Sequence, residues 1–194
     1  MKILLATRNK GKILEIKSLL SKTNVTLMSL DDLDVIDVEE TGKTFIENAC
    51  LKASQYAKQA KCWAIADDSG LEVEALGNAP GVFSARYAGI SATDAENRNK
   101  LLKELEIIDN RNGRFVCVIA ISNHIGEIKF TAKGVCHGKI DLKPSGLNGF
   151  GYDSVFIPDG FKETFGVLDF KIKEEISHRQ KAISKIVKYL SKIT

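Results

Sequence analysis

The sequence has few of the features that mark special classes of protein. Its 194 residues include only three prolines and no low-complexity run, which argues against a disordered or fibrous chain. Its four cysteines lie far apart and form no C-x-x-C pair, so neither a zinc site nor a disulfide framework is predicted. No segment approaches the ~20 apolar residues of a membrane-spanning helix, and the apolar start of the chain is too short for a signal peptide. These absences predict a cytoplasmic protein without a membrane partner.

Three catalytic signatures are also missing. The G-x-x-x-x-G-K-[ST] loop of P-loop nucleotide hydrolases does not occur. The G-x-S-x-G elbow of serine hydrolases and a Cys-His signature are missing as well. A covalent serine or cysteine nucleophile is therefore not predicted.

The composition that is present is typical of a globular protein. Apolar residues make up 44% of the chain and charged residues 27%. The length suits one domain over residues 1–194. The net charge of +3 suits a polyanionic small molecule, but it is too small to predict a stable nucleic-acid partner.

The apolar spacing in the first third of the chain predicts alternating strands and helices. Residues 2–6 are typical of a buried strand, and helical spacing follows from Ile13. Thr44 and Glu47 have the spacing of a capping box and predict a helix over residues 44–60.

The rest of the chain predicts further strands and a closing helix. Residues 62–66 predict a strand that ends in two carboxylates and a Ser-Gly turn after Asp68. Residues 114–122 and 127–136 predict a hairpin, and the last helix is expected to begin at Ser177. We expect an α/β fold with a mixed central sheet flanked by helices.

The polar loop between the first strand and the first helix is a candidate phosphate site. Backbone amides and the helix dipole attract anions at a helix N-terminus, and this loop adds three cationic side chains. Its residues are Thr7, Arg8, Asn9, Lys10, Gly11 and Lys12. A basic loop of this kind also occurs as solvated surface, so its position leaves both interpretations open.

Two carboxylate pairs, Glu39-Glu40 and Asp67-Asp68, are candidate metal ligands. If they converge, they suit Mg²⁺, which needs few protein ligands when phosphate oxygens and water complete its coordination. The alternative is that Glu39 and Glu40 belong to an acidic surface run.

A glycine-rich loop before the last strand is a candidate site for a base. Its aromatic side chains Phe150 and Tyr152 can stack on a base, and Asp153 can accept a hydrogen bond. A tight turn with core aromatics is the structural alternative. His178 and Arg179 open the last helix and can reach an oxygen-rich ligand, although such a pair is usually surface.

Taken in order, these motifs resemble the inosine triphosphate pyrophosphatase family, also called the XTP/dITP pyrophosphatases. The family's opening [ST]-x-N-x-x-K motif matches residues 7–12. Its most diagnostic block matches Ala66-Asp-Asp-Ser-Gly-Leu71 and continues to residues 84–89. Other blocks match residues 39–53, 149–153 and 173–182. The resemblance therefore covers nearly the whole chain.

The resemblance implies Mg²⁺-dependent hydrolysis of ITP, dITP and XTP to the monophosphate and pyrophosphate, which cleanses the nucleotide pool. It also implies a homodimer and a twisted sheet with two lobes around a deep active-site cleft. Asp68 would be the general base and would bind Mg²⁺ together with Glu40. The residues that would contact the substrate are Thr7, Arg8, Asn9, Lys10, Gly11, Lys12, Lys52, Ser69, Phe150, Gly151, Tyr152, Asp153, Lys173, His178 and Arg179.

Two alternative functions remain open at this point. A related pyrophosphatase that acts on other nucleotides, such as modified pyrimidines, would carry a similar phosphate loop and acidic pair. A non-catalytic nucleotide sensor or RNA-binding module would use the same basic loop and aromatic residues. Release of pyrophosphate from ITP distinguishes these interpretations.

Overall fold

A computed structural model describes residues 1–21 and 23–193 of the chain. The strands are β1 (Lys2–Leu5), β2 (Thr26–Ser29), β3 (Trp63–Val73), β4 (Asn112–Ser122), β5 (Ile128–Ile140) and β6 (Phe156–Pro158). The α-helices are α1 (Lys10–Leu20), α2 (Phe45–Ala60), α3 (Asp94–Glu104), α4 (Phe170–Ile176) and α5 (His178–Leu190).

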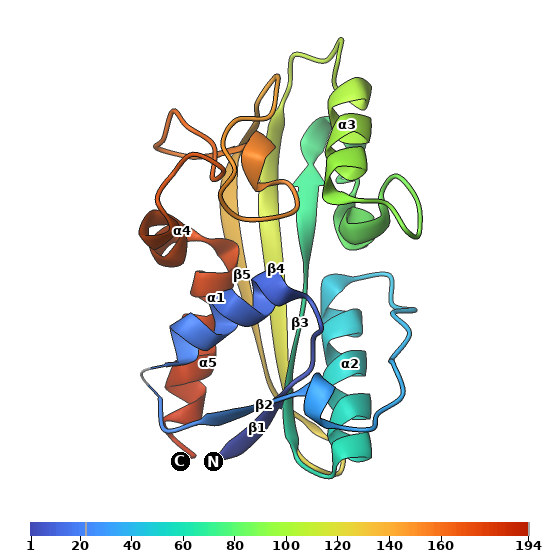
Figure 1. Cartoon of the computed structure of the whole chain (residues 1–194), viewed down its shortest axis with the longest axis vertical. Helices are drawn as coiled ribbons and strands as arrows, with labels where there is room; N and C mark the ends of the chain where they lie inside the picture. Colours follow the sequence, from blue (N-terminus) through green and yellow to red (C-terminus); the bar gives the residue numbers. More distant parts are fainter. Residues whose placement is uncertain (22, 194) are drawn as a thin grey trace. The chain divides into compact units, whose positions relative to one another are not determined.

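Six strands of the described chain form one sheet in the order β2-β1-β3-β4-β5-β6. Figure 1 labels β1 to β5 of this sheet. β1 pairs in parallel with both β2 and β3, whereas β6 pairs antiparallel with β5. The parallel pair β1 and β2 is joined by α1, because parallel neighbours need a crossover connection. The predicted mixed α/β fold is confirmed.

The chain divides into two compact units, each made of discontinuous segments. The first unit contains residues 1–68, 117–134 and 179–194, and the second contains residues 69–116 and 135–178. The chain passes between the units within β3, β4 and β5, and again at the start of α5. The single domain expected over residues 1–194 stays a prediction.

Each unit has its own hydrophobic core. In the first unit, side chains of β1, β3 and β4 pack with those of α1 and α5, and Ile3, Ile119 and Ile186 are buried there. In the second unit, aromatic side chains dominate the core, and the ring centroids of Phe115 and Phe156 are 4.5 Å apart. Separate cores give each unit a rigid frame for its own polar side chains.

Helix α2 forms where the sequence predicts it. Thr44 Oγ1 accepts a hydrogen bond from the backbone N–H of Glu47, whose carboxylate accepts one from Thr44 N. The apolar face of the helix, which includes Ala49 and Ala53, is buried. The helix ends at Ala60, and the C-cap residue Lys61 takes a left-handed conformation.

The expectation for β3 is wrong in one respect. The strand does not end before the two aspartates but continues through Asp67, Asp68 and Gly70 to Val73. Gly70 is not a turn residue, because a Cβ built on it would lie 2.3 Å from Ser84 Oγ and 2.4 Å from Gly81 O. The glycine allows another segment of the second unit to approach the strand closely.

The hairpin and the closing helix are confirmed. β4 and β5 are neighbours in the sheet, and the turn between them is closed by a hydrogen bond from Asn123 N to Glu127 O. Both strands extend further than the sequence predicts. The closing helix α5 begins at His178 and buries Ala182 and Ile186 one turn apart.

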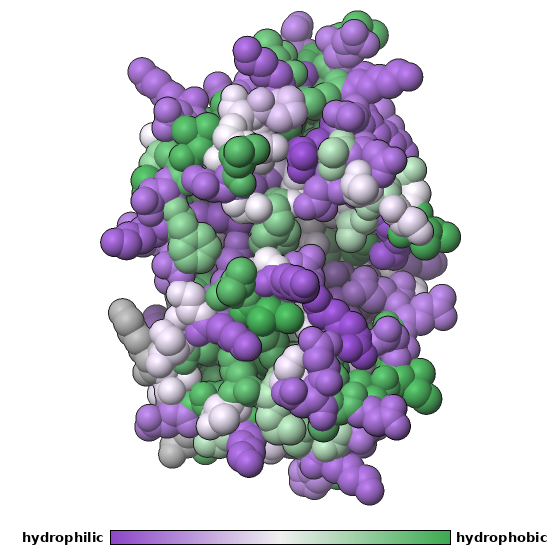
Figure 2. All heavy atoms as spheres, in the orientation of Figure 1, coloured by the Kyte–Doolittle hydropathy of each residue, from purple (hydrophilic) through white to green (hydrophobic). Residues whose placement is uncertain are grey.

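Hydrophilic side chains cover most of the face drawn in Figure 2, with apolar ones scattered between them. Exposed apolar residues of this kind are normal for a globular protein. Among the residues that the structure describes, no helix has both the length and the apolar character needed to cross a membrane.

Candidate active site

The loop between β1 and α1 is held in place by its own side chains. Thr7 Oγ1 accepts a hydrogen bond from Asn9 N at 3.2 Å, and Asn9 Oδ1 accepts one from Lys12 N at 3.0 Å, which caps α1. Lys10 and Gly11 form the first turn of the helix. The predicted position at a helix N-terminus is confirmed, while phosphate binding by this loop stays a prediction.

Arg8 lies in the same loop but points toward two carboxylates. Its Nη1 is 2.8 Å from Asp31 Oδ1 and its Nε is 3.1 Å from Asp37 Oδ1. The hydroxyl of Tyr56 donates to the same oxygen of Asp37 at 3.3 Å. These contacts tie the loop to the segment that leads to Glu40.

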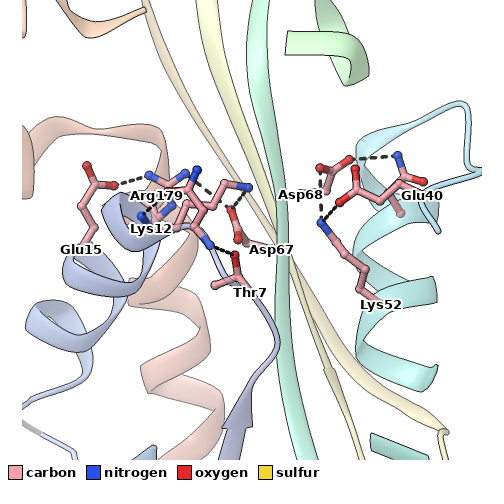
Figure 3. Close-up of polar contacts among 10 residues, drawn as sticks. Thr7, Lys12, Glu15, Glu40, Lys52, Asp67, Asp68 and Arg179 are labelled. Carbon is pink, nitrogen blue, oxygen red and sulfur yellow. Dashed lines mark hydrogen bonds and ion pairs between the residues drawn. The ribbon is translucent and has the colours of Figure 1, made fainter. Parts of the chain in front are cut away.

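The two adjacent aspartates of β3 point to opposite faces of the strand, as successive residues of a strand do. Figure 3 shows Asp67 on the side of α1 and α5, and Asp68 on the side of α2. The expected convergence of whole carboxylate pairs on one cation is therefore wrong for Asp67. Each aspartate has its own set of partners.

Asp67 belongs to a buried network with two cations. Its Oδ2 is 3.0 Å from Lys12 Nζ and 3.5 Å from Arg179 Nη2. The other terminal nitrogen of Arg179 donates to Glu15 Oε2. Arg179 is only 1% exposed and Asp67 has the same exposure. Lys12 is thereby held by a carboxylate that solvent does not reach.

Asp68 belongs to a second network on the other face. Asn48 Nδ2 donates to its Oδ2 at 3.1 Å, and Lys52 Nζ lies 3.6 Å from its Oδ1. The same ammonium group is 2.5 Å from Glu40 Oε1. A cation thus lies against both carboxylates that were expected to bind a metal.

The two networks shift the pKa values of the aspartates in opposite directions. Burial raises the pKa of the Asp68 carboxyl, and the attraction of Lys52 and Lys12 only partly offsets this effect. Burial also acts on Asp67, but there Lys12, Arg179 and Lys52 together outweigh it and lower the pKa. Two carboxylates whose environments push their pKa values apart are typical of a site in which one acts as a base.

Glu40 and Asp68 fit a magnesium ion that shares its coordination with a substrate. Both offer oxygen ligands, and Mg²⁺ uses one or two carboxylates together with phosphate oxygens and water. In the described part of the chain, no group of three or more His, Cys, Asp or Glu side chains is arranged to hold a metal. The residues present therefore do not fit a metal that requires a complete cage of protein ligands.

The second unit contains a buried ion pair beneath an aromatic ring. Lys173 Nζ is 2.5 Å from Asp153 Oδ2, and both residues are buried. The same carboxylate oxygen accepts a hydrogen bond from Phe150 N at 2.8 Å. Lys173 Nζ also lies 4.8 Å from the centroid of the Phe150 ring. The structure therefore brings together three of the residues expected to contact the base or sugar.

Gly151 and Tyr152 continue this loop. Gly151 has a φ of 59°, in the left-handed region that glycine tolerates. Tyr152 is buried, and its hydroxyl donates to Ser84 O at 2.9 Å. Tyr152 is thus a core residue, as the structural alternative for this loop predicts, whereas Phe150 is partly exposed.

His178 and Ser69 also lie in the second unit. The His178 ring stacks on Phe115, with centroids 4.8 Å apart and planes 15° apart, and the residue is buried. Ser69 follows Asp68 in β3 and is partly exposed. Their contacts with a substrate stay predictions.

Several residues that the sequence did not single out support these networks. Glu15 pairs with Arg179, and Asn48 orients Asp68. Asn48 lies one residue after Glu47 of the capping box and within the matching block of residues 39–53, so the sequence did offer a signal for it. The other partners are far apart in sequence, so no local spacing could identify them.

Comparisons with known proteins place the chain in a family. The sequence model of the Ham1 family matches residues 3–189. The chain belongs to the Ham1 family. A dITP/XTP pyrophosphatase of Synechocystis is 46% identical over 185 residues, which cover 95% of this chain and 93% of that protein. A dITP/XTP pyrophosphatase of Oceanobacillus iheyensis is 44% identical, with 99% of each chain covered.

Solved structures of Ham1 proteins have the same fold. A HAM1 protein from Coxiella burnetii is 42% identical with a TM-score of 0.91, and 99% of each chain is covered. The Ham1 protein of Staphylococcus aureus is 40% identical with a TM-score of 0.89 over the whole of both chains. The resemblance to the XTP/dITP pyrophosphatases that the motifs indicate is confirmed.

Proposed function

We propose that this Ham1-family chain hydrolyses ITP, dITP and XTP to the nucleoside monophosphate and pyrophosphate. Such an activity removes altered purines from the nucleotide pool before they enter DNA or RNA. The observation that carries the proposal is the buried carboxylate of Asp68, which accepts a hydrogen bond from Asn48 and lies against Lys52, whose ammonium group also contacts Glu40. The names of the relatives support the same substrates.

In this proposal Asp68 is the general base. It accepts a proton from a water molecule while the water oxygen forms a bond to the α-phosphorus. The bond between the α-phosphorus and its bridging oxygen breaks, and pyrophosphate leaves. A carboxylate with a raised pKa suits this step, because a general base works best when its pKa is near the working pH.

The phosphates would lie against cationic side chains. We assign them to the loop of Thr7, Arg8, Asn9, Lys10, Gly11 and Lys12, and to Lys52. Lys12 and Lys52 already lie against carboxylates, and a triphosphate would share these cations. Their charge would neutralise the negative charge that develops on the leaving pyrophosphate.

Mg²⁺ is the proposed cofactor, and Glu40 and Asp68 would hold it. When bound, it neutralises phosphate charge and polarises the phosphoryl group. The metal would bind the same two carboxylates that the Lys52 ammonium group contacts. With the metal bound there, Lys52 would contact phosphate instead.

Phe150, Gly151, Tyr152 and Asp153 would hold the base and sugar, and His178 would read the base edge. Ser69 would contact the nucleotide, and Lys173 would reach phosphate or base. Stacking on Phe150 cannot distinguish purines, since each offers a similar face. Hydrogen-bond donors of the protein can distinguish the purines, because such a donor pairs with the 6-oxo group of hypoxanthine but not with the 6-amino group of adenine.

Arg179 was predicted to be one of these donors, and that role stays a prediction. In the structure its guanidinium is directed at Glu15 and Asp67. This arrangement supports a different role for Arg179, which is to hold Asp67 and, through Asp67, Lys12. Turnover of ITP, XTP and ATP by an Arg179→Met variant distinguishes the two roles.

A homodimer that works in the cytoplasm, without a nucleic-acid or membrane partner, is the proposed biological state. Cys50, Cys62, Cys117 and Cys136 are free thiols, which supports a reducing compartment. Light scattering of the purified protein tests the dimer.

Incubation of the protein with ITP and Mg²⁺ tests the proposed activity. We expect equimolar inosine monophosphate and pyrophosphate, and no product when EDTA removes the metal. Release of orthophosphate, or no release with ITP, dITP and XTP, would contradict the proposal. Faster turnover of modified pyrimidine triphosphates would assign the chain to the related pyrophosphatase activity instead.

A further inference from the structure

Helix α3 carries two polar side chains that reach out of the helix to one glycine. Asp94 and Arg98 are four residues apart and therefore lie on the same face of the helix. Gly151 N donates to Asp94 Oδ2 at 2.7 Å, and Arg98 Nη1 donates to Gly151 O at 2.7 Å. Both contacts join residues more than fifty positions apart in sequence, within the second unit.

The two contacts fix successive peptide groups next to Phe150. The N–H of Gly151 belongs to the peptide that follows Phe150, and the carbonyl belongs to the next peptide. On the other side, Phe150 N donates to Asp153 Oδ2. Gly151 has a positive φ and the freedom that glycine has there, so these hydrogen bonds limit the conformations of the loop.

Helix α3 is itself firmly held, so it can serve as a fixed support. Thr93 caps it in a capping box with Glu96. Asn97 donates to Ala85 O and accepts from Ala88 N, and Leu101 is fully buried in the core of the second unit. The position of the Gly151 peptides is therefore set by a rigid element and not only by the loop.

We propose that Asp94 and Arg98 are positioning residues that hold the loop of residues 149–153 in the conformation that receives the base. They act through the Gly151 backbone and do not contact the substrate. The proposal rests on the assignment of Phe150 and Asp153 to base and sugar in the proposed function.

Four variants and one control test this role. Asp94→Ala and Arg98→Ala each remove one hydrogen bond to a charged side chain. Asp94→Asn keeps an acceptor for Gly151 N, and Arg98→Lys keeps a donor for Gly151 O. Lys103→Ala is the matched control, because Lys103 is an exposed residue of the same helix.

The first measurement is hydrogen–deuterium exchange, which does not depend on activity. Asp94→Ala and Arg98→Ala should speed exchange in residues 148–153 by about tenfold, since a hydrogen bond to a charged group is worth about that factor. The conservative variants should restore most of the protection, and Lys103→Ala should not change it. Unchanged exchange in the alanine variants would overturn the proposal.

The second measurement separates the base from the phosphates. The alanine variants should raise the KM for ITP and the inhibition constant of inosine monophosphate about tenfold, as one lost hydrogen bond to a charged group implies. Inhibition by inorganic tripolyphosphate, which has no base, should change less than about twofold in the same variants. An equal loss for both inhibitors would assign the contacts to general folding and overturn the positioning role.

Failure of the proposed function would look different. A wild-type protein that does not hydrolyse ITP contradicts the proposed function, whatever the exchange data show. Wild-type hydrolysis of ITP with an unchanged KM in the alanine variants contradicts the role of Asp94 and Arg98 alone.

Discussion

Replacing Arg179 by methionine removes a cation from between two buried carboxylates. Arg179, Asp67 and Glu15 are all buried, and methionine keeps most of the side-chain volume without the charge. After the substitution Asp67 keeps its ion pair with Lys12, whereas Glu15 loses its ion pair with the guanidinium group.

The structure predicts a large loss of stability. Removal of one partner from a buried ion pair costs about 3–5 kcal/mol, because it leaves a charge without compensation. A chain of this length loses about 2–4 °C of Tm for each kcal/mol, so the Tm should fall by about 6–20 °C. Urea denaturation followed by circular dichroism measures the free energy of unfolding.

The loss of stability in Arg179→Met should become smaller as the pH falls. In the wild type the lowered pKa of Asp67 contributes stability above the pKa of the unfolded state, and this contribution is lost as the pH falls. In Arg179→Met the carboxyls can take up protons at a higher pH, which relieves their buried charge. The difference in unfolding free energy between the two proteins should therefore be larger at pH 7 than at pH 5.

The same variant distinguishes the two roles of Arg179. If it holds Asp67 and Lys12, kcat/KM falls by the same factor for ITP, XTP and ATP. A fall confined to ITP and XTP would show that Arg179 reads the base edge. Lys188→Met, at an exposed position of the same helix, is the control. A stability loss below about 1 kcal/mol for Arg179→Met would show that Arg179 does not stabilise the buried carboxylates of Asp67 and Glu15.

Three further predictions concern the two networks of the first unit. Lys12→Ala and Lys52→Ala should weaken ITP binding far more than inosine binding in calorimetry, and equal weakening would mean that these lysines do not serve the phosphates. Lys52→Met should move the acid limb of the pH profile of kcat/KM to higher pH, because Lys52 lowers the pKa of Asp68. An acid limb at the wild-type pH would contradict the role of Asp68 as the titrating base. Asn48→Ala should lower kcat by about tenfold or more while KM stays nearly constant, since the substitution removes a hydrogen bond to Asp68. A change in KM alone would contradict the role of Asn48 in orienting Asp68.

Local signals in the sequence predict the helices well. The capping box of Thr44 and Glu47 sets the start of α2, and the apolar spacing after Ser177 predicts α5. Both signals depend on residues within one or two turns of each other. Such short-range patterns are what a single sequence shows most directly.

The course of β3 could not be predicted from local patterns. Two aspartates followed by Ser-Gly are typical of a turn, yet the strand continues through them. Asp67 is accommodated because Arg179 lies against it, and these residues are 112 positions apart. Burial of a charge depends on partners that the fold brings together.

The candidate residues could be predicted by type but not by orientation. The motifs identified Asp68, Glu40 and Lys52, and the structure brings these three together. The alternation of side chains along β3 separates Asp67 from Asp68, and this could not be predicted while the segment was taken as a strand end. Asp94 and Arg98 lie in a segment that carried no motif.

The phosphorus atom that water attacks decides whether the chain releases pyrophosphate by the proposed reaction. The protein is incubated with ITP and Mg²⁺ in water enriched in ¹⁸O, and the products are analysed by mass spectrometry. We expect ¹⁸O to enter inosine monophosphate and not pyrophosphate. Asp68→Asn should lower the rate by ~10²-fold or more while the Tm stays close to that of the wild type. Label in pyrophosphate, release of orthophosphate, or an Asp68→Asn variant that keeps more than about a tenth of the activity would contradict the proposed reaction.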